Sequence, residues 1–305
     1  MNDLLREELG FSGLLVTDAM TMGAVRTRYG DTEPLILALE AGADILLMPR
    51  DVPAAVAVIV QAVHDGRLRE ERIDRSVRRL LEAKARAGLH TRREVNVESV
   101  PHIVNVPEHA VVARDAAERS MVLVRDSRGN VPLSQSVRRV LAVTYAETAD
   151  PIAGRAFDRE LRLHGYTVTA ARVDDRTTAV EYDGLRARAD SADVIIVSAY
   201  VHPRDGRGEI GTGGGFTAFV NRLAAVASRP LIVVSFGSPY LLSAFPSVSS
   251  YLLAWGGAPL SQQAAVRALA GLAPITGTLP VSLPPHHRLG DGERRAVAAA
   301  AAAPE

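Results

Sequence analysis

The sequence predicts an α/β fold in which parallel strands alternate with helices along most of the chain. Two observations lead to this prediction. Short, continuous runs of aliphatic and β-branched residues, typical of strands buried on both faces, recur along the sequence. Most of them are separated by stretches of helical length that carry capping and helix-ending residues. Such alternation favours a parallel sheet with right-handed helical crossovers.

The first 90 residues contain two strand–helix units. "GLLVTD" (13–18) and "ADILLMP" (43–49) predict buried strands, and helices are expected over 31–42, 51–66 and 69–88. Residues suited to begin and end the first two helices flank them: Asp31 or Thr32 with Gly42, and Asp51 with Gly66. On the last helix one side is apolar, with Ile73, Val77, Leu80 and Leu81. Two strands alone make no stable parallel sheet, so we expect this region to be part of a larger structure.

Residues 91–108 are polar and β-branched and contain two prolines, which predicts an extended linker. Residues 109–285 predict a doubly wound parallel α/β domain. Its expected strands are 121–126, 138–144, 165–170, 193–201, 230–236, 250–255 and 278–283. Its expected helices are 109–120, 151–165, 181–190, 215–228 and 261–272. The alanine-rich tail, residues 286–305, has no apolar stripe, so we expect a frayed or disordered end.

Composition excludes several classes of function. Lys plus Arg and Asp plus Glu number 35 each, which argues against nucleic acid or an anionic membrane as partner. The absence of cysteine excludes disulfides, thiolate nucleophiles and thiolate metal sites. No apolar run approaches the roughly 20 residues that span a bilayer, and the first residues show no signal-peptide pattern. We therefore expect a soluble chain, cytoplasmic by default, whose compartment would change if a further N-terminal segment existed.

Asp18 is the leading candidate for a reactive group. It directly follows a predicted buried strand, where parallel α/β folds and barrels place reactive side chains, although a carboxylate there could also cap a turn or helix. Met20 and Met22 follow closely and could fill gaps in packing or form the wall of a ligand pocket.

Other motifs argue against cofactor and metal chemistry. The glycine-rich segment "DGRGEIGTGGGF" (205–216) matches neither the dinucleotide fingerprint nor the P-loop. The eight histidines are scattered without metal-binding spacing, and no Gly-x-Ser-x-Gly elbow of a serine hydrolase occurs. We therefore expect neither a cofactor nor a metal.

Several segments resemble glycoside hydrolase family 3. "LLREELGFSGLLVTDAMTMGAV" is similar to the family's nucleophile segment, and "ALEAGADILLMP" to the strand-eight region that follows. "HAVVARDAAERSMVLVRDSRGNVPLS", "VVSFGSPYLL" and "AWGGAPLSQQAAVRALAGLAPITGTLPVSLP" are similar to parts of its C-terminal α/β sandwich domain. The resemblance implies that residues 1–90 are the last two βα units of a TIM-type barrel. Residues 109–285 would be the α/β sandwich.

The Asp-x-Met-x-Met pattern looks more like the β-N-acetylhexosaminidase branch than the β-glucosidases, which usually carry Ser-Asp-Trp. The resemblance implies retaining hydrolysis by an exo-acting enzyme with Asp18 as nucleophile and Met22 near the bound sugar. The implied substrate is a terminal N-acetylglucosamine of an amino-sugar glycoside or a cell-wall fragment. A β-glucosidase-like hydrolase and a non-catalytic carbohydrate-binding or interaction module are the alternatives.

The chain also departs from the family pattern. A complete barrel takes about 250 residues, whereas about 95 precede the linker here. The His–Asp segment that supplies the general acid/base in the hexosaminidase branch has no match, and neither do the upstream sugar-binding positions. Glu209 is the one candidate for the acid/base role that the β-glucosidase branch suggests. We therefore expect a truncation, a misassigned start or half of a split enzyme, inactive unless a separate N-terminal barrel portion joins it.

Overall fold

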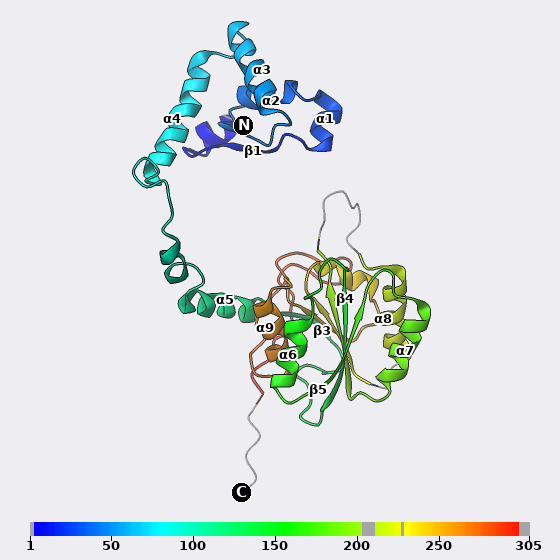
Figure 1. Ribbon diagram of the computed structural model, residues 1–305. Helices are drawn as coiled ribbons and strands as arrows, with labels where there is room; N and C mark the ends of the chain where they lie inside the picture. Colours follow the sequence, from blue (N-terminus) through cyan, green and yellow to red (C-terminus); the bar gives the residue numbers. More distant parts are fainter. Residues whose placement is uncertain (1–2, 203–210, 227–228, 299–305) are drawn as a thin grey trace. The chain divides into compact units, whose positions relative to one another are not determined.

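The computed structural model describes residues 3–202, 211–226 and 229–298 (Figure 1). The chain divides into two compact units, Met1–Val100 and Pro101–Glu305. We describe each unit by itself. Glu209, the candidate acid/base, lies outside the described residues.

Unit 1 contains one parallel pair of strands and four α-helices. Strand β1 (Val16–Ala19) pairs with β2 (Ile45–Leu47), with Val16 opposite Ile45 and Ala19 opposite Leu47. The helices are α1 (Gly23–Tyr29), α2 (Glu33–Glu40), α3 (Val52–His64) and α4 (Glu70–Arg86). A π-helical turn, η1 (Asp3–Glu8), precedes β1, and a 3-10 helix, η2 (Val97–His102), follows α4.

Local sequence signals explain some of these elements. Thr32 precedes α2 as expected but its side chain makes no capping hydrogen bond. Asp51 caps α3 as expected, because its carboxylate accepts a hydrogen bond of 3.0 Å from the amide of Ala54. The small core of unit 1 centres on one cluster of buried apolar residues: Ile36, Leu39, Ala62 and Leu68. Helix α1 was not among the expected elements. It has no buried residue and no side-chain cap, so it lacks the apolar periodicity that predicts a helix.

Helix α4 buries only part of the side that the apolar pattern predicted. Val77 and Leu81, on the predicted apolar side, are 47% and 59% exposed, whereas Ser76 is buried. The hydroxyl of Ser76 donates to Asp44 over 2.6 Å. Ile73, on the same predicted side, does pack against the small core of unit 1. The Ser76 hydrogen bond and this apolar contact therefore hold α4 together, and only part of the predicted apolar side is covered.

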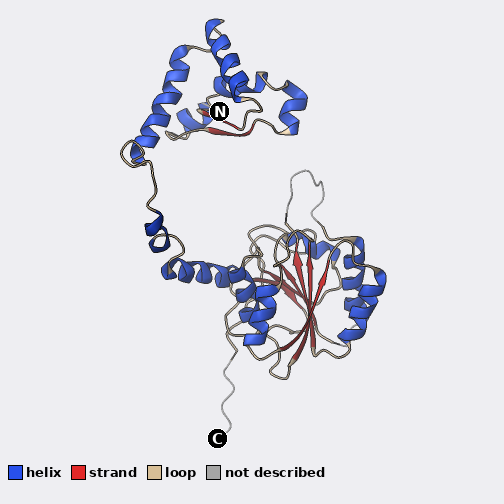
Figure 2. Ribbon diagram, in the orientation of Figure 1, coloured by secondary structure: helices blue, strands red, loops and turns tan. Residues whose placement is uncertain are grey.

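Unit 2 is built on a six-stranded sheet of order β3-β8-β7-β6-β4-β5 (Figure 2). The strands are β3 (Val122–Asp126), β4 (Arg139–Ala146), β5 (Thr167–Val173), β6 (Val194–Tyr200), β7 (Leu231–Ser235) and β8 (Ser250–Leu253). Five strands are parallel, and β3 pairs with β8 in the antiparallel direction at one edge. The α/β class with a mostly parallel central sheet is thus confirmed, with one antiparallel edge strand.

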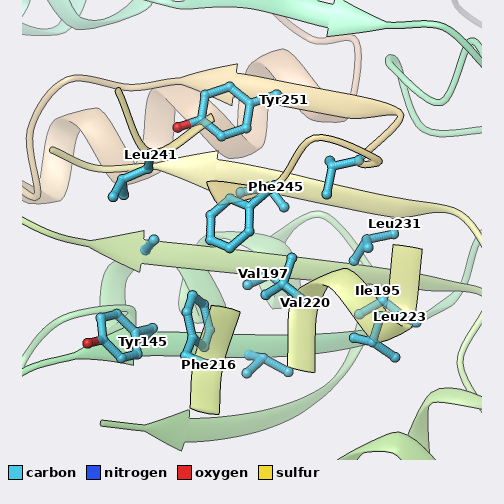
Figure 3. Close-up of a cluster of buried hydrophobic side chains, with 14 of the residues drawn as sticks. Tyr145, Ile195, Val197, Phe216, Val220, Leu223, Leu231, Leu241, Phe245 and Tyr251 are labelled. Atoms are coloured by element: carbon cyan, nitrogen blue, oxygen red, sulfur yellow. The ribbon is translucent and has the colours of Figure 1, made fainter. Parts of the chain in front are cut away.

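Helices cover both faces of this sheet. They are α5 (Pro107–Ser120), α6 (Arg155–Leu163), α7 (Ala179–Ala189), α8 (Gly214–Val226) and α9 (Pro259–Leu269), with a 3-10 helix η3 (Pro239–Ala244) after β7. Helices α7 and α8 lie on one face and α6 and α9 on the other (Figure 1). Figure 3 shows the core under α8, where Phe216 lies beside Tyr145 and Phe245 points toward the strands.

Two expectations for the last part of the chain are wrong. Residues 278–283 form no strand, because Pro280 has no amide hydrogen to donate, and only Leu283 forms an isolated bridge, to His287.

Residues 286–298 are not a frayed tail. Glu293 forms a β-bridge with Leu123, and the Arg295 guanidinium donates to the buried Asp126 carboxylate over 2.9 Å. Polar contacts hold this segment in place, so the lack of an apolar stripe did not predict disorder here. Residues 299–305 lie outside the described part.

Candidate active site

Asp18 lies in β1, one residue before its C-terminal end, and is exposed. Its Oδ1 accepts a hydrogen bond of 2.7 Å from the amide of Ala19, the next residue in the chain. It does not cap the following helix: α1 begins after Met22, and no side chain caps it. Of the two interpretations of Asp18, the capping one therefore fails for α1. The carboxylate stands free at the end of a parallel strand, with Oδ2 unbonded within the described part of the chain.

The end of β1 is tied to the end of β2. The amide of Met20 donates to the carbonyl of Leu47 over 2.9 Å, and the amide of Leu47 donates to the hydroxyl of Thr17 over 3.0 Å. Immediately after β2, Met48 has a φ of 50° and is 60% exposed. A positive φ is uncommon for a residue with a side chain, and such strain concentrates at functional sites. Met48 is a residue that the sequence analysis missed, and no local pattern signals its backbone angle.

Met22 follows the strand end as the N-terminal cap residue of α1. Its carbonyl accepts hydrogen bonds of 3.1 Å from the amides of Val25 and Arg26, and 47% of its surface is exposed. Packing into the core of unit 1 is therefore not its role. A half-exposed thioether near a strand-end carboxylate is available to contact a ligand.

A hollow of about 360 Å³ lies after β2, between the starts of α2 and α3. Its lining includes Thr32, Pro49 and Arg50. Asp31, also in the lining, pairs with Arg26 over 3.1 Å and with Arg50 over 3.3 Å. Asp18 is not among the residues that line this hollow.

Asp44, which the sequence analysis did not single out, fixes the opposite end of the strand pair. Its carboxylate is fully buried and accepts from Arg6 (2.6 Å), the Leu15 amide (3.0 Å), Ser76 (2.6 Å) and Arg79 (3.1 Å). Burial by itself raises the pKa of Asp44, but the hydrogen bonds and the Arg6 charge outweigh it and hold the pKa below its usual value. This ion cluster anchors η1, β1, β2 and α4 together. The sequence signal that could have identified Asp44 is its place as an acidic residue at the start of a predicted buried strand.

Unit 2 has its own polar contacts at the carboxyl ends of its strands. The hydroxyl of Tyr145, the seventh residue of β4, donates to Asp175 and accepts from the amide of Gly213 over 2.9 Å. Burial and the Asp175 carboxylate raise the pKa of Tyr145 well above its usual range. These contacts hold Gly213, in the described part of the glycine-rich segment, against the sheet. In the described part of the chain, no three histidine or acidic side chains gather as a metal site would require.

Comparisons with known proteins agree on one family. Residues 1–83 match the family model described as the glycosyl hydrolase family 3 N-terminal domain. A β-N-acetylglucosaminidase/β-glucosidase of Cellulomonas fimi is 27% identical over 290 residues, covering 92% of this chain and 51% of the relative. A probable β-glucosidase C of Aspergillus flavus is 34% identical over 144 residues, covering 44% of this chain and 23% of the relative.

Solved structures show the same relationship. The family 3 β-N-acetylglucosaminidase of a Paenibacillus strain has a TM-score of 0.76 and 27% identity, covering 92% of this chain and 53% of that one. A β-glucosidase of Listeria innocua has a TM-score of 0.75 at 19% identity, covering 93% and 42%, and supports the fold alone. The chain spans about half the length of the Cellulomonas and Paenibacillus relatives. The chain is a relative of the glycoside hydrolases of family 3, and residues 1–83 carry part of that family's N-terminal domain.

Proposed function

We propose that this chain carries the nucleophile of a retaining glycoside hydrolase, an exo-acting β-N-acetylhexosaminidase that removes terminal N-acetylglucosamine. One observation carries the proposal: Asp18 stands exposed at the end of a parallel strand inside the segment that matches the family model. The Cellulomonas and Paenibacillus relatives, both named as β-N-acetylglucosaminidases, support the choice of sugar.

The chemistry needs Asp18 as a carboxylate. One oxygen attacks the anomeric carbon while the bond to the leaving oxygen breaks, and a general acid protonates that oxygen. The same group, now a base, then takes a proton from water, which attacks the anomeric carbon and releases Asp18. The free Oδ2 of Asp18 is suited to the attack, while the hydrogen bond from the Ala19 amide to Oδ1 orients the carboxylate. Met22, half-exposed four residues on, would contact the sugar.

The general acid/base is not assigned among the described residues. We propose that it comes from a separate N-terminal barrel portion that pairs with β1 and β2. Within the described residues β1 and β2 pair only with each other, so each has an open edge. On α3, Val52, Val56 and Val60 form an apolar stripe that is 59%, 56% and 49% exposed. Additional strand–helix units would cover both the edges and the stripe.

A β-glucosidase activity is the second candidate. The Cellulomonas relative is named for both activities, and the Aspergillus relative for β-glucosidase alone. The two activities are separated by comparing aryl N-acetyl-β-glucosaminide with aryl β-glucoside as substrates. The N-acetylglucosaminide should be hydrolysed with the higher kcat/KM.

A chimera tests the assignment of Asp18. Residues 1–83 replace the matching segment of the Cellulomonas enzyme, so that the rest of the barrel is present, and release of 4-nitrophenol is measured. The Asp18→Asn chimera should lose activity by at least about a thousandfold because it removes the nucleophile. The control is Asp74→Asn, which changes an exposed carboxylate on α4 and should leave activity unchanged.

Two results would count against the proposal. If the Asp18→Asn chimera stays active, another group is the nucleophile. If the unmodified chimera folds but hydrolyses neither substrate, the segment does not support catalysis and a non-catalytic role follows. The isolated 305-residue chain should release no 4-nitrophenol above background.

A further inference from the structure

Unit 2 contains a mostly apolar hollow of about 190 Å³. Its lining comes from β3, from η3 and the residues after it, and from residues 283–287. A cavity of about 150 Å³ is enough to hold a benzene ring. This hollow therefore has room for one ring and a small substituent. No acidic side chain is among its lining residues.

Two walls of the hollow are fixed in place. Residues 283–287 form a tight loop in which Leu283 and His287 exchange both backbone hydrogen bonds, 2.8 and 3.0 Å. On the other side, Leu241 and Phe245 are buried in the core, and both appear in Figure 3 beside Tyr251 and its neighbours. They anchor η3, which presents Leu242 to the hollow. The walls are thus preformed, as ligand sites usually are.

Arg125 supplies a positive charge at the edge of the hollow. Its Nη1 donates to the carbonyls of Pro246 (2.8 Å) and Val248 (3.2 Å), which fixes the plane of the guanidinium. Its Nε and Nη2 have no acceptor within the described part of the chain. A fixed guanidinium with free donors matches the geometry of a carboxylate.

His287 adds a second polar group with no partner. Its Nε2 is buried and makes no hydrogen bond in the described structure. The two nearby acids are already occupied: Asp291 accepts from the Arg288 amide over 2.7 Å, and Glu293 accepts from Arg295 over 2.7 Å. Burial and the charge of Arg125 lower the pKa of His287, so its ring is neutral near pH 7. A neutral ring in the wall adds no second charge, so Arg125 is the charged group that the hollow offers to an anion.

We propose that this hollow is a binding site for a small ring-bearing carboxylic acid. The ring lies against Leu242 and the prolines of the 283–287 loop. The carboxylate accepts hydrogen bonds from the free donors of Arg125, and the His287 ring forms part of the wall. This site is independent of the glycosidase assignment, because it uses none of the residues of unit 1.

Benzoate is the probe, titrated into the full chain by calorimetry and by NMR of the histidine ring resonances. For nine non-hydrogen atoms, ligand efficiency predicts a dissociation constant on the order of 1 mM. Benzamide, which has the same shape without the charge, and acetate, which lacks the ring, should each bind at least tenfold more weakly. Saturation with benzoate should shift the ring signals of His287.

Variants locate the site. Arg125→Gln should weaken benzoate binding at least tenfold, whereas Arg128→Gln, an exposed arginine three residues on, should leave it unchanged. Arg125 also donates to two backbone carbonyls, so its replacement disturbs the local structure as well as the charge. A second variant that keeps these contacts is therefore needed. Ser243→Trp fills the hollow from an exposed position whose hydroxyl bonds only to the Tyr240 carbonyl, and it should abolish binding. Equal binding of benzoate and benzamide, no binding up to about 20 mM, or full binding to Ser243→Trp would each overturn the proposal.

Discussion

The two units bury their apolar residues to very different extents. In unit 2 every residue of β6 and β7 is buried, and helices pack on both faces of the sheet. In unit 1 no residue of β1 or β2 is fully buried, although β2 is wholly aliphatic and an apolar run, Leu14 to Val16, leads into β1. Strand composition alone therefore does not decide burial. A parallel strand becomes an interior strand only when neighbouring strands and helices cover it.

Helix α3 illustrates the same point within one element. Ala55 and Ala62 are buried against the small core of unit 1, while Val52, Val56 and Val60 on another side are about half-exposed. A helix that is apolar on more than one side is typical of a position between two neighbours. The core of unit 1 is one of these two neighbours, and the side with Val52, Val56 and Val60 is left without one in the described residues.

The largest predicted difference between the units is the loss of unfolding free energy when one apolar side chain is shortened in each. Phe157→Ala removes a fully buried ring that packs edge-to-face on Phe236, 5.8 Å away, and should lower the unfolding free energy of unit 2 by about 3–5 kcal/mol. Val56→Ala removes an exposed side chain of unit 1 and should change stability by less than about 0.5 kcal/mol. Fluorescence of Trp255, the single tryptophan, follows unit 2 during urea unfolding. Amide hydrogen exchange in α3 follows unit 1. A large effect of Val56→Ala would show that its stripe is already covered.

The ion cluster at Asp44 gives the next largest effect. Asp44→Asn leaves Arg6 and Arg79 beside an uncharged group, and should cost unit 1 about 3 kcal/mol at pH 7. Because the folded-state pKa of Asp44 is lowered, its contribution is complete above the unfolded-state pKa of about 3.9. That contribution is lost as the pH falls through the folded-state pKa. The difference between the native chain and Asp44→Asn should therefore shrink below about pH 4.

Hydrogen exchange of the β1 and β2 amides between pH 3 and pH 7 measures this difference. Asp74→Asn, on the exposed side of α4, is the matched control and should have no effect. A difference that stays constant down to pH 3 would contradict the role of the Asp44 charge.

Much of the fold could be predicted from the sequence because local signals and tertiary structure agree in unit 2. The buried strands of unit 2 follow from their continuous apolar runs. In unit 1 the capping residue Asp51 correctly marks the start of α3. The antiparallel direction of β3 could not be predicted, since an edge strand of either direction has the same composition. Residues 286–298 were misjudged because their anchors, such as Arg295 on Asp126, join positions 169 residues apart.

The candidate site was predictable only in part. The placement of Asp18 after a strand is a local property, and the structure has it at the strand end. Its catalytic role stays a prediction, as does that of Met22. The φ of Met48 and the buried charge of Asp44 depend on contacts that no local pattern reveals.

The smallest predicted effect concerns Asp158, a carboxylate of α6 that has the opposite character to Asp44. Its Oδ1 is buried without a hydrogen-bond partner, and burial raises its pKa to about 6, against a weaker opposing effect of Arg162. The ionised form therefore disfavours folding. The resulting loss of folding free energy begins as the pH rises through the unfolded-state pKa near 3.9, and it is complete above about pH 6.

Asp158→Asn should consequently stabilise unit 2 at pH 7 by about 1 kcal/mol, a value reduced from the full shift because the side chain is partly solvated. At pH 4 the gain should be much smaller, because the native carboxyl is then mostly protonated in the folded state. Urea unfolding followed by Trp255 fluorescence at both pH values measures the gain, with the exposed Asp183→Asn as control. A gain that is equal at both pH values would mean that packing, and not charge, accounts for it. One buried acid thus strengthens unit 1 because four donors surround it, while another weakens unit 2 because its buried oxygen has none.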